Sequence, residues 1–320
     1  MAGEARVAAA VAVIAAAAPD VLLITGFDHD LDGVALAAFA ARLAAAGLDY
    51  PARFAPAGNR GVPTGLDLDE DGRADGPGDA QGWGRFSGAG AMAVLSRLPI
   101  APGARDFSGF LWRDLPGGAA ASALPAAALA VQRLHAAGAW EVPVILPGGV
   151  VLRVLAFHAT PPLFDGAEAR NRRRNADEVA FWTRLLDGAL PAAPPEPPFV
   201  LMGNANLDPA DGAGYRGAIA ALLAHPAVQD PAPAGAGGAA AAAAQGGANA
   251  DHRGDPARDT ADFRDAGGTG NLRVDYVLPS ADLRVTGAGV LWPAPDDPLA
   301  AAVAAAGRHR LVWVDIALPP

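Results

Sequence analysis

Two histidines stand at the ends of apolar runs, where an imidazole could act as an acid or a base. His309 comes just before the last apolar run of the chain, and another apolar run ends at His158. A third run contains Asp275. If these runs are strands, Asp275 could lie beside His309, where its carboxylate would fix the tautomer of the ring and raise its basicity. The spacing therefore predicts a catalytic imidazole that is oriented by a carboxylate.

A fourth apolar run leads into Gly-Asn-Ala-Asn, which contains Asn204 and Asn206. Amides at this position could orient water or a bound anion. Four strand-like segments that each carry polar side chains at one end predict a sheet whose edge forms an active site.

The elements that must position these residues follow from apolar periodicity and from its interruption by glycine and proline. A long loop rich in glycine and aspartate is expected over 58–90, and the low-complexity stretch 231–270 is expected to be a surface excursion that is partly mobile. Helices are expected over 5–18, 33–46, 168–186 and 215–224, and strands over 21–25, 92–95, 110–112, 151–157, 198–202, 272–278, 283–286 and 311–318.

Five motifs, in this order along the chain, resemble those of the endonuclease/exonuclease/phosphatase superfamily of metal-dependent nucleases and phosphatases. They are Ser96–Ile100, Phe157–His158, Gly203–Asn206, Arg273–Leu278 and Arg308–His309. The resemblance implies one domain over 1–320 that contains the 231–270 excursion. It also implies a four-layered α/β sandwich, in which two packed, mostly antiparallel sheets are flanked by helices.

The chain departs from the superfamily pattern at several functional positions. Gly26 stands where a metal-binding glutamate is usual, Asn204 replaces an aspartate, and Arg308 replaces the last acidic residue. The usual first strand, which ends in an asparagine, does not precede the first helix. The chain thus resembles a divergent bacterial-type member, and we expect an unpaired strand edge and a gap in the core. A form with restored upstream sequence should be more stable and more active.

The resemblance implies hydrolysis of phosphate esters, of the phosphodiesterase, nuclease or phosphatase type, with Mg²⁺ or Mn²⁺ polarising a phosphoryl oxygen. His309 would be the general base, Asn204 and Asn206 would position water and phosphate, and His158 would stabilise charge in the transition state. The alternative is a catalytically degenerate member that binds a phosphorylated ligand or a protein partner.

Two further sets of charged residues are candidates for this chemistry. Arg170 and Arg173 belong to the densest positive cluster and could clamp a phosphate, although they could equally pair with nearby acids on a helix surface. Asp28 could take over from the missing glutamate as a metal ligand, or it could be an ordinary acid at a helix entry.

The segment 67–79 has the spacing of a calcium loop. Asp67, Asp69 and Asp71 would converge there, and Asp75 would bind directly or through water. Its twelfth position is a glycine, so Asp79 is the candidate replacement for the usual glutamate. The alternative is a solvated acidic turn. Calcium loops that bind weakly need extracellular calcium, which favours a periplasmic or extracellular protein if an upstream signal was omitted.

Composition narrows the choice of partners. The net charge of −10 provides no general attraction to nucleic acid, so a small phosphate ester or a nucleic-acid end is the expected substrate. The chain has no cysteine, which excludes disulfides and thiolate metal sites. No apolar run is long enough to cross a membrane. We expect a monomer.

Overall fold

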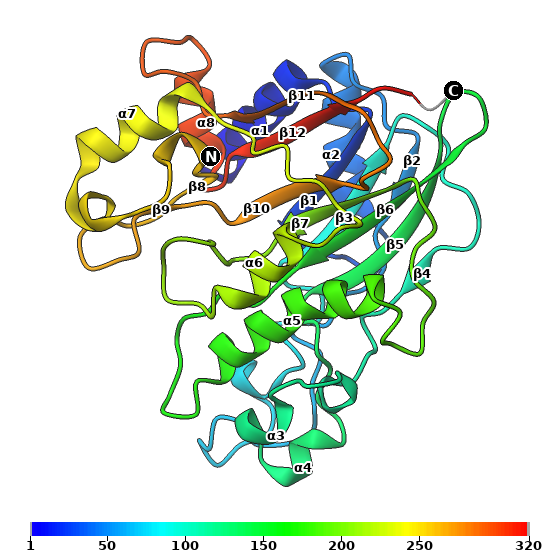
Figure 1. Ribbon diagram of the computed structural model, residues 1–320, viewed down its shortest axis with the longest axis vertical. Coiled ribbons are helices and arrows are strands. Elements are labelled where there is room, and N and C mark those ends of the chain that lie inside the picture. The colour runs from blue at the N-terminus through cyan, green and yellow to red at the C-terminus, as the bar shows by residue number, and fades with distance from the viewer. Residues whose placement is uncertain (1, 319–320) are drawn as a thin grey trace.

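The protein is described here by a computed structural model, which covers residues 2–318 (Figure 1). Two sheets face one another and helices cover their outer faces, which confirms the expected α/β sandwich. The helices are α1 (Ala2–Ala17), α2 (Val34–Ala45), α3 (Ala120–Ala123), α4 (Ala126–Leu129), α5 (Arg170–Leu186), α6 (Gly217–Leu223), α7 (Ala236–Gln245) and α8 (Ala300–Ala306).

The first sheet has three antiparallel strands in the order β1-β3-β2. They are β1 (Val21–Phe27), β3 (Ala91–Ser96) and β2 (Ala52–Phe54). A bulge interrupts β1 between Thr25 and Phe27, and Gly26 adopts a φ of 72° there. Helices α1 and α2 cover the outer face of this sheet through a cluster that includes Leu43 and Leu95.

The second sheet has five strands in the order β10-β7-β6-β5-β4. Only the β6–β7 pair is parallel, and α5 lies on the crossover between these two strands. The buried side chains of Phe181 and Trp182 hold α5 against the outer face of the sheet. The strands are β10 (Asp275–Pro279), β7 (Phe199–Asn204), β6 (Val151–His158), β5 (Gly138–Ile145) and β4 (Arg105–Asp106).

The inner faces of the two sheets form a separate apolar core. Val94 from the first sheet packs there with Trp140, Val154 and Val200 from the second. Each such large apolar side chain contributes about 1.5–3 kcal/mol when it is fully buried. The core therefore fixes which side chains of these strands point inward and which point outward.

Two strand pairs lie beside these sheets. The pairs are β11 (Val285–Leu291) with β12 (Leu311–Ile316), and β8 (Ala261–Asp262) with β9 (Asn271–Leu272). Among residues 2–318, β1 pairs with β3 and β12 pairs with β11, and no further strand pairs with either of them. Within the same part of the chain, no helix is both long and apolar enough to cross a bilayer.

One expected strand is absent, and one observed strand was not expected. Residues 110–112 do not form a strand, because Phe110 and Trp112 bury their rings from a loop that enters the 3₁₀ turn Trp112–Asp114. Strand β5 was not expected, since Gly138 and Pro143 interrupt its apolar pattern. Pro143 lies where residues 99–101 cross the outer side of β5, and its carbonyl still accepts from the amide of Ala101 at 2.8 Å. The proline therefore removes one donor at the edge of the sheet, where this loss is tolerated.

The predicted strand 272–278 is divided between β9 and β10. The segment 231–270 contains α7, two 3₁₀ turns (Gly247–Asp251 and Pro256–Arg258) and β8. Gly237 and Gly238 allow α7 to pack closely, because a side chain at either position would collide with the backbone of Pro293 or Pro256. The alanine-rich composition of this segment therefore gave no sign that its helix packs against the rest of the fold.

Candidate active site

Three polar residues form a row across neighbouring strands of the second sheet. His158 ends β6, Asn204 ends β7, and Asp275 begins β10. Asn204 lies opposite His158 in the parallel ladder and opposite Asp275 in the antiparallel one. The register of one sheet thus brings together three residues that are far apart in the sequence, as the apolar runs predicted.

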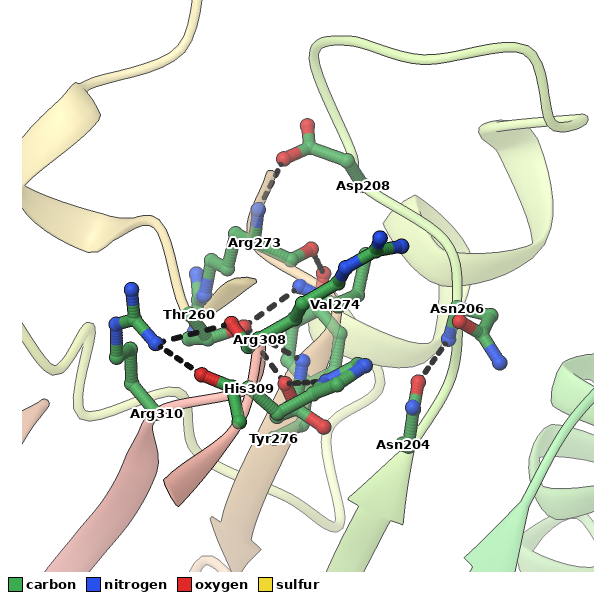
Figure 2. A network of polar contacts seen from close by, with 12 residues as sticks. Asn204, Asn206, Asp208, Thr260, Arg273, Val274, Tyr276, Arg308, His309 and Arg310 are labelled. Carbon is green, nitrogen blue, oxygen red and sulfur yellow. Dashed lines mark hydrogen bonds and ion pairs between the residues drawn. The ribbon is translucent and has the colours of Figure 1, made fainter. Parts of the chain in front are cut away.

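His309, which lies two residues before β12, joins this row. Its Nδ1 lies 2.8 Å from Oδ2 of Asp275, and its side chain is 38% exposed. The same oxygen accepts a hydrogen bond of 3.0 Å from Oγ1 of Thr260. Figure 2 shows Thr260 and His309 gathered at the start of β10. The expected His–Asp contact is therefore present, and Thr260 adds a second donor that holds the carboxylate.

The proton positions in this pair follow from its chemistry. A carboxylate accepts, so Nδ1 of His309 carries the hydrogen, and Nε2 is the atom left for exchange of a proton. Burial lowers the pKa of His309, but the charge and the hydrogen bond of Asp275 outweigh this effect, so the pKa is raised above its usual value. The pair is therefore suited to general acid–base chemistry near neutral pH.

His158 is buried and contacts Arg60, which the sequence did not single out. Nη2 of Arg60 lies 3.2 Å from Nε2 of His158. Because a guanidinium can only donate, Nε2 accepts and the proton of the neutral ring sits on Nδ1. Burial, then the charges of Arg60 and His309, lower the pKa of His158 well below its usual value. His158 is thus a neutral acceptor that orients Arg60.

Asn204 and Asn206 form a small turn at the end of β7 (Figure 2). The backbone amide of Asn206 donates to Oδ1 of Asn204 at 2.7 Å, and its side-chain amide donates to the carbonyl of Ala159 at 2.9 Å. Asn206 adopts a φ of 49°, a left-handed conformation that asparagine tolerates better than most residues. These contacts fix both amides beside the row.

The two arginines predicted to bind phosphate have other partners. Arg170 donates to the side-chain oxygen of Gln132, and Arg173 donates to the carbonyl of Glu168. Neither makes a hydrogen bond to the residues of the row. Within the described chain, Arg60 is the arginine whose guanidinium contacts His158.

Three acidic residues near this centre accept hydrogen bonds from backbone amides. Asp28 accepts from the amide of Gly90, and Asp30 caps the start of α2 through the amide of Val34. Asp208, which is buried, accepts from the amides of Ala210, Asp211 and Arg273. None of the three makes a hydrogen bond to His158 or His309.

This donor set limits how a divalent cation could be held. Asp275 uses Oδ2 for both of its side-chain contacts, so Oδ1 has no hydrogen-bond partner among residues 2–318. Oδ1 of Asn206 is also without one in the same part of the chain. Mg²⁺ is commonly bound by one or two carboxylates together with water and substrate phosphate. These two oxygens suit that mode of binding, with fewer acidic ligands than the resemblance implies.

A second acidic group lies in the loop 67–79. The carboxylates of Asp67, Asp69 and Asp71 place oxygens within 4.8 Å of one another, and all three residues are exposed. Asp75 is not part of this group, since it pairs with Arg73 at 3.0 Å. Asp79 is buried and accepts from the amides of Leu68 and Gly76, so it closes the loop as a backbone acceptor. The loop thus assembles three of the five predicted ligand positions.

Replacing the partner of His309 should change both its titration and the stability of the protein. In Asp275→Asn, burial and the charges of Arg310 and Arg308 remain, and all of these lower the pKa of His309, so it should fall below its usual value of about 6.5. A raised pKa stabilises the fold fully below that usual value, and the contribution is lost as pH rises through the raised value. The variant should therefore lose more stability at pH ~5.5 than at pH ~9.

NMR titration of the ring protons and urea unfolding at both pH values would measure these effects. His135 is the internal control, because burial lowers its pKa to about 3 and it should stay neutral in both proteins. An unchanged titration of His309 would contradict the coupling to Asp275.

The sequence profile of the Endonuclease/Exonuclease/phosphatase family matches residues 2–309 of the chain. A search of curated proteins gave no match. The fold is similar to that of an endonuclease/exonuclease/phosphatase from Beutenbergia cavernae, with 20% identity and a TM-score of 0.53 over 97% of this chain. The chain spans 65% of the length of that structure.

A family protein from Leptotrichia buccalis has 13% identity and a TM-score of 0.53, with 98% of this chain and 93% of that chain covered. At these identities the likeness shows the fold alone, and the profile match over almost the whole sequence decides the family. The chain belongs to the endonuclease/exonuclease/phosphatase family.

Proposed function

We propose that this protein hydrolyses phosphate esters at the centre formed by His309, Asp275, Asn204, Asn206 and Arg60. The observation that carries the proposal is the 2.8 Å contact between His309 and Asp275 at the end of the His158–Asn204–Asp275 row. Members of the family are phosphoesterases, which is the reaction class that such a centre suits.

Arg60 provides the positive charge for the substrate. No carboxylate lies within ion-pair distance of it in residues 2–318, and its contact to His158 leaves its charge unneutralised. Burial lowers the pKa of Arg60 and the charge of Glu178 partly offsets this, while both carboxylate oxygens of Glu178 accept from the backbone. A partly buried guanidinium in this state is suited to paired hydrogen bonds with a phosphate.

His309 transfers the proton in this proposal. With Nδ1–H donated to Asp275, the unprotonated Nε2 can take a proton from an attacking water, and the protonated ring can later return it to the leaving group. The side chains of Asn204 and Asn206 lie beside this path and would orient the water and the phosphate. Thr260 keeps the acceptor oxygen of Asp275 in place.

Magnesium or manganese would be held by Oδ1 of Asp275 and Oδ1 of Asn206, together with water and the substrate. When bound, the ion would polarise a phosphoryl oxygen. The rest of the chemistry depends on the side chains described above.

A second candidate function is phosphate-ligand binding without turnover. It is favoured by Gly26, Asn204 and Arg308, which stand where the resemblance places acidic residues. This candidate keeps the role of Arg60 and removes that of His309, so variants of these two residues separate the candidates.

His309→Gln should lose hydrolysis of bis(p-nitrophenyl) phosphate by about 10²–10⁴-fold, the usual contribution of a general acid–base group. His225→Gln is the matched control, since His225 also pairs with an aspartate, Asp187, at 3.2 Å, but on another part of the fold. Rates would be measured with Mg²⁺, with Mn²⁺ and with chelator. Equal losses in both variants, or none in either, would contradict the proposed base.

Arg60→Lys should weaken inhibition by inorganic phosphate by about ten-fold, because an ammonium cannot reproduce the paired hydrogen bonds of a guanidinium. Arg170→Lys is the control, and its inhibition constant should stay near that of the wild type. A larger effect at Arg170 than at Arg60 would instead favour the helix α5 arginines as the phosphate site.

We also propose that the carboxylates of Asp67, Asp69 and Asp71 bind Ca²⁺. At 100 times the dissociation constant, the ion should add about 2.7 kcal/mol to the free energy of unfolding. Asp69→Ala should abolish this calcium-dependent rise in melting temperature, whereas Asp75→Asn should keep it because Asp75 pairs with Arg73. A response that survives in Asp69→Ala would show that the segment is a solvated turn.

A further inference from the structure

Arg308 lies directly before His309, on a stretch of backbone that is held from both sides. The carbonyl of Arg308 accepts from the amide of Asp262 at 2.9 Å, and the amide of Arg310 donates to the carbonyl of Thr260 at 2.7 Å. Thr260 is also the residue that holds the carboxylate of the catalytic pair. The point at which the side chain of Arg308 leaves the backbone is therefore fixed relative to His309.

Three arginines lie around this part of the site (Figure 2), and two of them are neutralised. Arg310 pairs with Asp262 at 2.7 Å, and Arg273 pairs with Asp230 at 2.6 Å. Arg308 is exposed, and its guanidinium makes no ion pair or side-chain hydrogen bond with any of residues 2–318. Its positive charge is therefore available to a ligand.

The side chain of Arg308 points toward the row of catalytic residues. In Figure 2 the side chains of Arg308 and Arg310 diverge, and the guanidinium of Arg308 extends to the side on which Asn206 lies. Its charge also acts on the neighbouring imidazole. Burial and the charge of Asp275 have the largest effects on the pKa of His309, and the charges of Arg310 and Arg308 lower it. A guanidinium therefore lies within electrostatic range of the proposed base.

Arg60 lies at the opposite end of the same row. It contacts His158, which ends β6, whereas Arg308 is next to His309, which pairs with Asp275 at the start of β10. Strand β7 lies between β6 and β10, so two strand spacings, roughly 10 Å, separate the ends of the row. A phosphate bound over the middle of the row would therefore lie between two guanidiniums.

The charge and the oxygens of the ligand decide what two guanidiniums can hold. A phosphate monoester carries about −1.5 to −2 charges at pH 7 and offers three acceptor oxygens. A phosphodiester carries one negative charge and one acceptor oxygen fewer, because its second ester bond uses that oxygen. Each guanidinium can donate a pair of parallel hydrogen bonds. Two of them are thus better matched by a monoester.

We propose that Arg308 binds the phosphate of the substrate from the His309 end of the row and, together with Arg60, selects phosphate monoesters over diesters. This inference rests on the proposed function, because it assigns Arg308 to the phosphate on which His309 would act. It adds a specificity residue that is separate from the proton transfer.

The first test measures binding, which does not require turnover. Affinities for inorganic phosphate and for dimethyl phosphate are measured by calorimetry at pH ~8, above the second pKa of a phosphate monoester. The proteins are the wild type, Arg308→Gln, Arg308→Lys and the control Arg284→Gln. Arg284 is also exposed and its carbonyl accepts from the amide of Ala317, so it lies beyond the far end of β12. The control removes the same charge without touching the site.

We expect Arg308→Gln to weaken the binding of inorganic phosphate by about ten-fold and that of dimethyl phosphate by no more than about two-fold. Arg308→Lys should lie between this variant and the wild type, because an ammonium keeps the charge but not the paired geometry. Arg284→Gln should bind both ligands as the wild type does. In hydrolysis, Arg308→Gln should lower the ratio of kcat/KM for p-nitrophenyl phosphate to that for bis(p-nitrophenyl) phosphate by about five-fold or more.

The outcomes separate this inference from the proposed function. Binding that depends on Arg308 in a protein that hydrolyses neither ester would contradict the hydrolase and leave the phosphate contact standing. Hydrolysis with an unchanged substrate ratio in Arg308→Gln would overturn the inference alone. Equal weakening of both ligands, the same losses in Arg284→Gln, or no binding of phosphate by the wild type would also overturn it.

Discussion

The parallel pairing of β6 with β7 is the constraint on which the rest of the site depends. It sets His158 beside Asn204, and the antiparallel addition of β10 then sets Asp275 on the far side of Asn204. A parallel pair needs a crossover, and α5 provides it. The amide of Asn175 on α5 donates to the carbonyls of Thr160 and Ala205, just after the two strands. The helix that connects the strands thereby also holds their polar ends together.

The electrostatics of the centre differ from those of the whole chain. The protein carries a net charge of −10, yet Asp28 and Asp208 accept from backbone amides and Asp275 pairs with His309. Arg60 remains charged beside a neutral His158. Arg60 therefore gives the proposed phosphate site a local positive charge, while the net charge of the chain disfavours the binding of a long polyanion. This combination agrees with a small substrate or a chain end better than with an extended duplex.

The residues at the ends of strands could be predicted, because an apolar run next to a polar residue can be recognised in the sequence itself. His158, Asn204, Asp275 and His309 were found in this way. Arg60 was missed because it lies in a glycine-rich loop without periodicity, and only the folded loop brings it to His158. Thr260 was missed because it lies in the alanine- and glycine-rich excursion. The signal available in the sequence was a hydroxyl group in the segment just before the strand that carries Asp275.

The bulge at Gly26 affects how this centre can change in evolution. The space around a side chain at that position is open, with no atom within 4 Å of a Cβ. The obstacle is the backbone, since a φ of 72° costs about 1–2 kcal/mol for a residue other than glycine. A carboxylate at this position would therefore meet no crowding, and its only cost would be this backbone strain. Loss of the bulge would remove that cost, so a substitution that straightens β1 would make an acidic residue at position 26 easier to accept.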